Sequence, residues 1–433
     1  MSYSRRDFAR LLAVSGATAI VPPAMWRNGA PGLDDFDLAS TPVTPAPPRP
    51  AETYWQDVRG QFLVPRDLHF FNAANLCPTS LPAIQAVERN IQKFDADPSP
   101  EVRTALMNER ERARRMLAAA YRVTPDEIVI TRNTTESNNF VSSGLDLEAG
   151  DEVLVWADNH PSNLDAWRVK AQRFGFTVVT APTPDRHPGP DGYVELFATR
   201  MTPRTRLVAV THVSSNSGDL LPVKEICALA RSRGALSLVD GAQSFGVLDT
   251  DLTATGCDFY SGSMHKWPCG PKETGMLFIR KGVETRLSPS IVGLYGGQVG
   301  VSRTFEANGQ RDDASLAAVT AALELQSTIG RAAVEARARE LAAAMIDGVR
   351  KLPGVTLWTN PAPTHSAAIV IFQPGALDPR RLAAALRDKD RITCTARGGA
   401  HNPGLRLAPH IYNTMDEVDG VVAAIRKYLV NGV

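Results

Sequence analysis

Short apolar segments alternate with longer amphipathic segments along much of the chain. The short segments are rich in β-branched residues, apolar on both faces and bounded by turns, which is typical of strands buried in a parallel sheet. The amphipathic segment at residues 222–234 begins with Pro and ends with Gly, as helices prefer. Strands that alternate with helices predict an α/β fold with a mostly parallel sheet. The strands are predicted at residues 127–131, 151–156, 176–180, 206–213, 235–240, 258–262 and 275–279.

Two flanking regions complete this pattern. Residues from about 52 onward predict a helix, a turn at Pro65 and a short strand at residues 68–71. The Ala-rich residues 314–353 predict a long helix that leads into a smaller α+β lobe. We therefore predict a large domain at residues 52–325 and a small C-terminal domain at residues 326–433.

The N-terminus predicts export. The motif SRRDF at residues 4–8 precedes a weakly hydrophobic run, and together they resemble a twin-arginine signal. The run is too short for a permanent membrane helix, so no stable membrane association is expected. We predict a signal at residues 1–30, a Pro-rich linker at residues 31–51 and a periplasmic or otherwise exported protein that meets the twin-arginine translocation machinery. Cleavage is expected after Ala19, Ala24 or Ala30.

Composition excludes several classes of partner. The 433 residues include 47 basic and 46 acidic ones, with no basic stripe that carries interleaved aromatics, so nucleic-acid binding is not expected. Five scattered cysteines without CxxC or His spacing argue against a metal site and against a disulfide framework. A soluble enzyme with a small-molecule substrate is the expectation that fits.

Polar side chains gather where the predicted strands end, which is where α/β sheets bind ligands. Asp240 ends one strand, and Lys266 follows another. Thr134 and Thr135 lie between a strand and a helix, where amides and hydroxyls can hold a phosphate. A lysine, a carboxylate and a phosphate turn are what pyridoxal phosphate (PLP) requires, so PLP is the predicted cofactor.

The motifs around these residues resemble those of the class V aminotransferases of the fold type I PLP superfamily. They are TRNTTESNN, DGAQSFG, SGSMHK and GLRLAPHIYNT. The resemblance extends over the chain after the linker and is closest to the isopenicillin N epimerase-like and cysteine desulfurase-like branches. It implies a mostly parallel sheet in a large domain, a smaller C-terminal α+β domain, a homodimer and an amino-acid-like substrate.

The resemblance also implies a role for each matched residue. Lys266 would form the Schiff base with the cofactor and later move the proton at the substrate Cα. Asp240 would pair with the pyridine nitrogen, and Gln243 would contact the ring oxygen O3′. The implied phosphate ligands are Thr134, Thr135, Ser263 and His265, and the implied substrate-side residues are Arg406, which would clamp the α-carboxylate, Arg397 and Asn75.

Some positions depart from the family pattern. His160 is the residue expected to stack on the cofactor ring, and it is also a catalytic candidate. Either Ser215 or Asn216 is expected near O3′. Gly309-Gln310 stands where the family often has a Gly-Thr pair that reaches the phosphate of the partner subunit, so Gln310 is expected to bind that phosphate.

Another departure from the family pattern reduces the number of expected reactions. Asn402 stands where the desulfurases carry their persulfide cysteine, and neither Cys394 nor Cys269 is at that position. A thiolate must accept the sulfur in that reaction, so a desulfurase is not expected. The expected reaction is transamination or epimerisation at Cα of an amino acid or amine-bearing metabolite.

Two alternatives to that reaction stay open. One is a C–S lyase that cleaves a cysteine conjugate, and the other is a PLP-binding protein without catalysis. Epimerisation would also need a second acid on the other face of the substrate. The candidates for that acid are His160, Tyr295 and His401.

Overall fold

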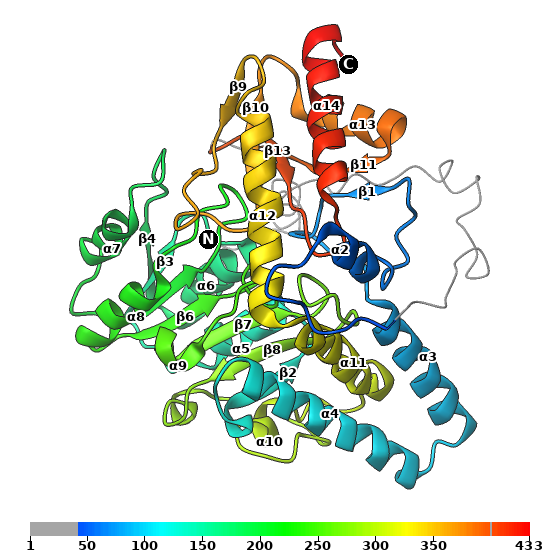
Figure 1. The fold of residues 1–433 in the computed structure, drawn as a ribbon. Helices are drawn as coiled ribbons and strands as arrows, with labels where there is room; N and C mark the ends of the chain where they lie inside the picture. Colours follow the sequence, from blue (N-terminus) through cyan, green and yellow to red (C-terminus); the bar gives the residue numbers. More distant parts are fainter. Residues whose placement is uncertain (1–41, 399–400) are drawn as a thin grey trace, which may run out of the picture. The chain divides into compact units, whose positions relative to one another are not determined.

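The computed structural model describes residues 42–398 and 401–433 (Figure 1). The compact unit Pro42–Val433 is described on its own. The predicted export signal and most of the predicted linker lie outside the described residues, so both stay predictions. None of the described helices is long and apolar enough to cross a membrane.

Seven strands of the described chain form the central sheet, in the order β2-β8-β7-β6-β5-β3-β4. All neighbours are parallel except that β8 is antiparallel to both β2 and β7, so the predicted mostly parallel sheet is confirmed. The strands are β2 Ile128–Thr131, β3 Glu152–Trp156, β4 Thr177–Ala181, β5 Thr205–Thr211, β6 Leu236–Asp240, β7 Phe259–Ser263 and β8 Gly275–Ile279.

Helices cover both faces of this sheet, which explains why its strands are apolar on both sides. Ile128 and Ile130 of β2 belong to one apolar cluster, while Val129 between them belongs to another. The first cluster includes residues of α4 (Pro100–Ala120), α7 (Pro190–Ala198), α8 (Val223–Ser232) and α11 (Asp313–Ile329). The second includes residues of α5 (Thr134–Gly144), α6 (Pro161–Phe174) and α10 (Ser302–Phe305). The large domain also contains α3 (Leu81–Ala96), which packs against α11, and the short helix α9 (Leu252–Thr255).

A smaller C-terminal domain contains an antiparallel sheet with the strand order β12-β13-β10-β9. Three helices pack with it around one apolar cluster. This confirms the predicted kind of second domain, while its exact boundary at residue 326 stays a prediction. The elements are α12 Arg331–Val349, β9 Val355–Leu357, β10 Val370–Pro374, α13 Pro379–Asp390, β12 Thr395–Arg397, β13 Gly404–Leu407 and α14 Met415–Asn431.

The single long helix predicted at residues 314–353 is wrong. The structure has two helices there, α11 and α12, separated by Gly330 at φ +94°. That φ is accessible to glycine and costly for other residues, so the chain turns at this point. Arg331 then directs its guanidinium to the Leu248 carbonyl at 2.8 Å and to Asp249 at 3.3 Å. A helical pattern that continues on both sides of one glycine does not reveal such a turn.

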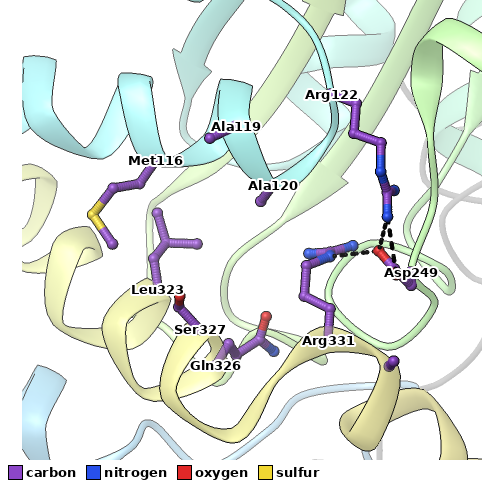
Figure 2. Close-up of a pocket in the computed structure, with 10 residues that line it drawn as sticks. Met116, Ala119, Ala120, Arg122, Asp249, Leu323, Gln326, Ser327 and Arg331 are labelled. Carbon is purple, nitrogen blue, oxygen red and sulfur yellow. Dashed lines mark hydrogen bonds and ion pairs between the residues drawn. The ribbon is translucent and has the colours of Figure 1, made fainter.

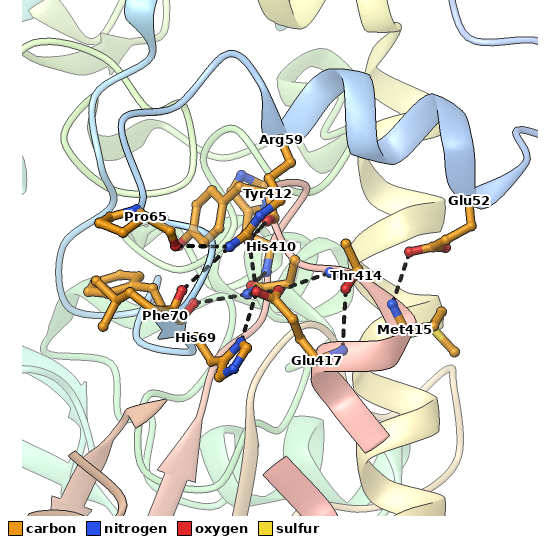
Figure 3. Close-up of polar contacts among 12 residues, drawn as sticks. Glu52, Arg59, Pro65, His69, Phe70, His410, Tyr412, Thr414, Met415 and Glu417 are labelled. Carbon is orange, nitrogen blue, oxygen red and sulfur yellow. Dashed lines mark hydrogen bonds and ion pairs between the residues drawn. The ribbon is translucent and has the colours of Figure 1, made fainter. Parts of the chain in front are cut away.

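The N-terminal elements are tied to the C-terminal domain. The predicted strand at residues 68–71 is found as β1 (His69–Phe70), which pairs in parallel with β11 (Ile392–Thr393). The carboxylate of Glu417 binds Arg59 of α2 (Glu52–Arg59) at 2.9 Å and His69 at 3.1 Å (Figure 3). Residue 417 thereby connects α14 to both N-terminal elements.

The Pro-rich end of the predicted linker also contacts the folded unit. The Ala46 amide donates to the Ile329 carbonyl at 3.3 Å. The Tyr54 hydroxyl donates to the Thr44 carbonyl at 2.9 Å, and Val43 packs on the cluster that includes Trp55. Residues 42–50 therefore lie against the body of the protein near the start of α12.

Candidate active site

The carboxyl ends of β7 and β2 lie on either side of the amino end of β8 at one edge of the central sheet. Ser263 at the end of β7 lies opposite Gly275 of β8, which in turn lies opposite Thr131 at the end of β2. A Cβ on Gly275 would lie 2.7 Å from the Gly262 carbonyl oxygen and 2.8 Å from the Asn133 Cα. Only glycine therefore allows the turn after β2 to come this close to β7.

A cavity of about 220 Å³ opens at this edge. It brings together ten of the predicted site residues, from six separate parts of the sequence. These are Asn75, Thr134, Thr135, His160, Ser215, Asp240, Gln243, Ser263, His265 and Lys266. The other lining residues are Asn133, Asp158, Ser162, Thr211, Val213 and Ala242.

A larger cavity, of about 460 Å³, lies elsewhere, between α4 and the junction of α11 with α12 (Figure 2). None of the predicted site residues lines it. Its charged side chains bind one another, because Asp249 accepts from Arg122 at 3.1 Å and from Arg331 at 3.3 Å. We therefore assign the chemistry to the smaller cavity, where charged groups lack such partners.

The turn after β2 forms a cup of donors at the N-terminus of α5. Asn133 caps the helix by accepting from the Glu136 amide at 2.9 Å. The Thr134 amide donates to the Ser263 hydroxyl at 2.8 Å, and the two hydroxyls are 2.7 Å apart. Thr135 also lines the cavity. A helix N-terminus with hydroxyls around it suits a phosphate group.

Asp240 is buried at the end of β6, with 1% of its surface exposed. One carboxylate oxygen accepts from the Ala242 amide at 3.0 Å, and the other accepts from the Asn138 side chain at 2.9 Å. Asn138 is itself held by the Ser261 hydroxyl at 2.7 Å. These donors stabilise the ionised carboxylate without cancelling its charge, so it can pair with a protonated ring nitrogen.

Lys266 presents an amine without a hydrogen bond or ion pair to the described residues. Burial lowers the pKa of its ammonium from 10.5 to about 8, although Asp240 acts in the opposite direction. Burial and the Lys266 charge also lower the pKa of the neighbouring His265 to about 4. Near neutral pH, His265 is therefore uncharged, and an appreciable fraction of Lys266 is the neutral, nucleophilic amine.

His160 caps α6 and lines the cavity. Its Nδ1 accepts from the Ser162 amide at 3.2 Å, which leaves Nε2 as the protonated nitrogen of the neutral ring. The ring is open to the pocket, yet the surrounding protein disfavours its charged form. Desolvation, followed by the charge of Lys266, lowers the pKa of His160. A neutral imidazole is compatible with the predicted stacking on an aromatic ring.

The structure separates the two candidates for the O3′ contact. Ser215 lines the cavity, whereas the Asn216 side chain donates to Asp158 at 2.5 Å. Gln243 donates to the Ala74 carbonyl at 2.8 Å and accepts from Trp267 at 3.0 Å. One Gln243 amide hydrogen is left for the pocket, so the side chain is held in place and can still donate.

Arg406 is a buried cation that has no acidic partner within 4 Å in the described chain. Its contacts are with the Ser215 carbonyl and the Asn72 side-chain oxygen, both at 3.4 Å, and its Nε is unpaired. Burial, and then the charge of Arg397, lower the pKa of Arg406 to about 9. A carboxylate from a ligand would supply the missing charge and hydrogen bonds.

Five predicted residues are not among those that line the cavity: Arg397, Arg406, Gln310, Tyr295 and His401. Gln310 is exposed; its predicted role concerns a partner subunit and stays a prediction. Tyr295 packs under the Arg103 guanidinium at 4.1 Å, and His401 is exposed. Among the three candidates for a second acid, His160 is the one that lines the cavity.

Sequence reasoning missed two residues of the site. Asn138 follows Thr134 by one helical turn, so helix periodicity could have placed it on the pocket side of α5. Asp158 lies two residues after β3, and Asp240 is the last residue of β6, so its place near a strand end could have identified Asp158. Its carboxylate accepts from Ser214 at 3.0 Å and from Asn216 at 2.5 Å.

These residues fit PLP. Lys266 offers a free amine, Asp240 a buried and fixed carboxylate, and the turn at Thr134 a set of phosphate donors. The residues that would hold the cofactor are thus in place on strand ends and helix N-termini.

Known proteins are similar to this chain in sequence. Residues 74–421 match the family described as aminotransferase class-V. The isopenicillin N epimerase of Streptomyces clavuligerus is 30% identical, over 86% of this chain and 97% of that protein. A probable cysteine desulfurase of Methanothermobacter thermautotrophicus is 29% identical, over 84% of this chain and 95% of that protein.

Solved structures of PLP enzymes are similar to this chain in fold. The cystine C–S lyase C-DES in complex with cysteine persulfide has a TM-score of 0.77 at 27% identity, covering 82% of this chain and 97% of its own. A variant of the same lyase with glycine covalently linked to its PLP cofactor has a TM-score of 0.79 at 27% identity, covering 85% and 98%. The chain therefore belongs to the class V aminotransferase family, and its cofactor is PLP.

Proposed function

We propose that the protein acts at the Cα of an amino acid or amine-bearing metabolite, by transamination or epimerisation. One observation carries the proposal: the buried guanidinium of Arg406 has no acidic partner within 4 Å in the described chain, and it donates to the carbonyl of Ser215, which lines the same cavity as the free amine of Lys266. A substrate that bears an amine and a carboxylate on one carbon would meet both groups. The similarity to isopenicillin N epimerases supports the same assignment.

The residues divide the work as follows. Bound PLP supplies an electron sink that makes bonds at the substrate Cα easier to break. Arg406 orients the substrate through its carboxylate, and Lys266 accepts and returns the Cα proton from its side of the pocket. For epimerisation, His160 is the candidate that could move a proton on the other side.

The test is a screen of purified holoenzyme against amino acids and small amines. Transamination should convert the cofactor to its amine form, whereas epimerisation should change the optical rotation of the substrate without that conversion. Lys266→Ala should abolish both signals, while Lys351→Ala, at an exposed lysine after α12, should leave them unchanged. A Lys266→Ala variant that still turns over substrate would contradict the proposal.

A C–S lyase is the second candidate. The structural similarity to the cystine C–S lyase favours it. Release of pyruvate from cystine or a cysteine conjugate, with no conversion of the cofactor, would support this reaction over the first. A desulfurase is disfavoured because Asn402 replaces the expected cysteine and none of the described cysteines lines the cavity.

Catalysis distinguishes these candidates from a PLP-binding protein without activity. Such a protein would retain the cofactor and turn over no amine in the screen. Two residues argue against a non-catalytic protein. A purely structural role for PLP would not require the free, nucleophilic amine of Lys266, and it would not require an arginine such as Arg406 that lacks an acidic partner.

We also propose export and dimerisation. The twin-arginine motif supports a periplasmic location, and cell fractionation should find the protein there, with Arg5→Lys/Arg6→Lys retaining it in the cytoplasm. The family resemblance supports a homodimer in which Gln310 contacts the partner's cofactor phosphate. Sedimentation should report twice the mass of the purified chain, which is 46.8 kDa with the predicted signal uncleaved, and Gln310→Ala should weaken cofactor retention.

A further inference from the structure

The larger cavity, between α4 and the junction of α11 with α12, reaches the back of the lysine segment through Gln326. This side chain lines the cavity and is 4% exposed. Its amide nitrogen donates to the Gly246 carbonyl at 2.9 Å and to the Trp267 carbonyl at 3.1 Å. Trp267 directly follows Lys266 in the chain. Gln326 therefore connects the larger cavity to the backbone that carries the reactive amine.

The side-chain oxygen of Gln326 has no donor among the described residues, because both hydrogen bonds of the side chain start from Nε2. Figure 2 shows this Oε1 atom directed into the larger cavity, toward the end of α4. Leaving an amide oxygen of a largely buried side chain without a donor costs free energy. A ligand N–H or O–H in the cavity would supply the donor.

Apolar side chains from three helices form much of the wall of the larger cavity. They are Met116, Ala119 and Ala120 of α4, Leu323 of α11 and Ala332 of α12. The alanines are short, and the cavity has a volume of about 460 Å³. Small-molecule sites in proteins measure about 300–1,000 Å³. The cavity therefore has the size and the apolar surface that a small ligand needs.

The charged side chains at the larger cavity are paired. Asp249 accepts from Arg122 at 3.1 Å and from Arg331 at 3.3 Å. Arg122 also lies 3.8 Å from Asp251, and Arg331 donates to the Leu248 carbonyl at 2.8 Å. Two cations therefore meet two carboxylates, and a charged ligand would have to compete with an existing pair. A neutral ligand fits this lining better.

We propose that the larger cavity is an effector site for a small, neutral, largely apolar molecule that donates one N–H or O–H to Gln326 Oε1. Indole is a simple member of this class. A donor on Oε1 polarises the amide and strengthens the hydrogen bonds from Nε2 to Gly246 and Trp267, because linked hydrogen bonds reinforce one another. The bound ligand thus holds the Lys266 segment more firmly. The inference does not depend on the proposed reaction, because the ligand does not contact the substrate.

The binding test compares indole with benzofuran, which has nearly the same shape and an oxygen in place of the N–H. Holoenzyme is titrated calorimetrically with each compound. Indole should bind about fivefold more tightly, as expected for one hydrogen bond between neutral groups. Indole-5-carboxylate keeps the N–H and adds a charge, so it should bind more weakly than indole.

Variants of the lining locate the ligand. Ala120→Leu fills the cavity from α4 and should abolish indole binding, whereas Ala343→Leu, at an exposed alanine of α12 outside the lining, should leave it unchanged. Gln326→Met removes the acceptor and should abolish the preference for indole over benzofuran. The cofactor absorbance of each variant verifies that the active site is folded.

Coupling to the active site is measured by the rate at which hydroxylamine releases the cofactor from Lys266, followed by absorbance. Saturating indole should slow this release about fivefold in the wild type, the lower end of coupling between two sites, and should not affect Ala120→Leu. A wild type that binds no indole, as expected where a second copy covers the cavity, would overturn the inference, and so would equal affinity for indole and benzofuran. Indole binding that persists in Ala120→Leu, or a release rate that bound indole leaves unchanged, would overturn it as well.

Discussion

Two regions of this protein bury charge in opposite ways. Beneath the edge strand β2, Arg114 binds Glu306 at 2.5 Å and Glu111 at 2.8 Å, and both Arg114 and Glu306 have 0% exposed side chains. At the carboxyl edge of the same sheet, Lys266 lines the cavity and Arg406 contacts the cavity residue Ser215, and neither buried cation has an ion pair in the described chain. The first region satisfies its charges within the chain, and the second leaves them unsatisfied.

The difference separates structural from functional charge. Arg114 also donates to the Ile128 carbonyl at 2.7 Å, while Glu306 accepts from the Ile130 amide at 2.5 Å. The pair thus fixes α4 and the segment after α10 to β2. In the pocket, by contrast, burying a charge without a partner raises the free energy of the ligand-free protein. Binding of a ligand of opposite charge offsets that increase.

The largest effect is expected in the paired region. Glu306→Gln removes one charge of a fully buried pair and leaves Arg114 with Glu111 alone. Breaking such a pair destabilises proteins by about 3–5 kcal/mol. Denaturant unfolding should show a loss of this size in the free energy of unfolding. A loss below about 1 kcal/mol, the range of surface pairs, would show that the cluster is not what secures β2.

Arg406→Met should affect substrate binding rather than stability, the opposite of what is expected for Glu306→Gln. It replaces an unpaired buried cation by an apolar side chain of similar length, so the free energy of unfolding should stay the same or increase. Substrate binding should weaken by about 2–5 kcal/mol, as when one member of a buried charge pair is removed. The measurements are denaturant unfolding and the KM of the substrate found in the screen. A destabilised variant with unchanged KM would place Arg406 in the structural class.

Strand ends explain how much of this site could be predicted. Asp240 and Lys266 follow apolar runs that a sequence scan finds easily, and parallel strands deliver their carboxyl ends to one edge. Asp240, Lys266, Thr134 and Thr135 were predicted in this way, whereas others of the ten predicted cavity residues, such as Asn75, His160 and Ser215, were implied only by the resemblance to the family. What the sequence does not contain is the set of partners each charge has in space.

The misses follow from that limit. The family resemblance pointed to Arg406 and not to Arg114, but only the fold shows that Arg114 meets Glu306 while Arg406 meets no acid in the described chain. The turn at Gly330 depends on a φ angle that the flanking helical pattern does not encode. Asn138 supports Asp240 from a different element, so its role appears only when α5 and β6 are packed together.

Lys266 gives a smaller, pH-dependent effect. In the cofactor-free protein its pKa is lowered to about 8 from 10.5, so between these values the folded state binds fewer protons than the unfolded state. Stability should therefore rise with pH across this window. The cost of burying the ammonium is fully present below about pH 8.

Unfolding of the cofactor-free wild type and of Lys266→Met at several pH values measures this effect. The variant should be the more stable protein below pH 8, and the difference should vanish as the pH approaches 10.5. A difference that is independent of pH would mean that Lys266 does not titrate in this window. Lys266 would then have a partner in solution and would not be an unmatched buried charge.

The smallest effect is expected where charges are paired at the surface. Asp347 binds Arg350 at 2.8 Å near the end of α12, with 57% and 51% of the two side chains exposed. The distance matches that of the buried Arg114–Glu111 pair, but water screens both groups, so Asp347→Asn should change the free energy of unfolding by about 0.5 kcal/mol or less. The same unfolding assay used for Glu306→Gln measures it. Equal losses for the two variants would show that burial is not what distinguishes these pairs, and the contrast between matched and unmatched buried charge would lose its physical basis.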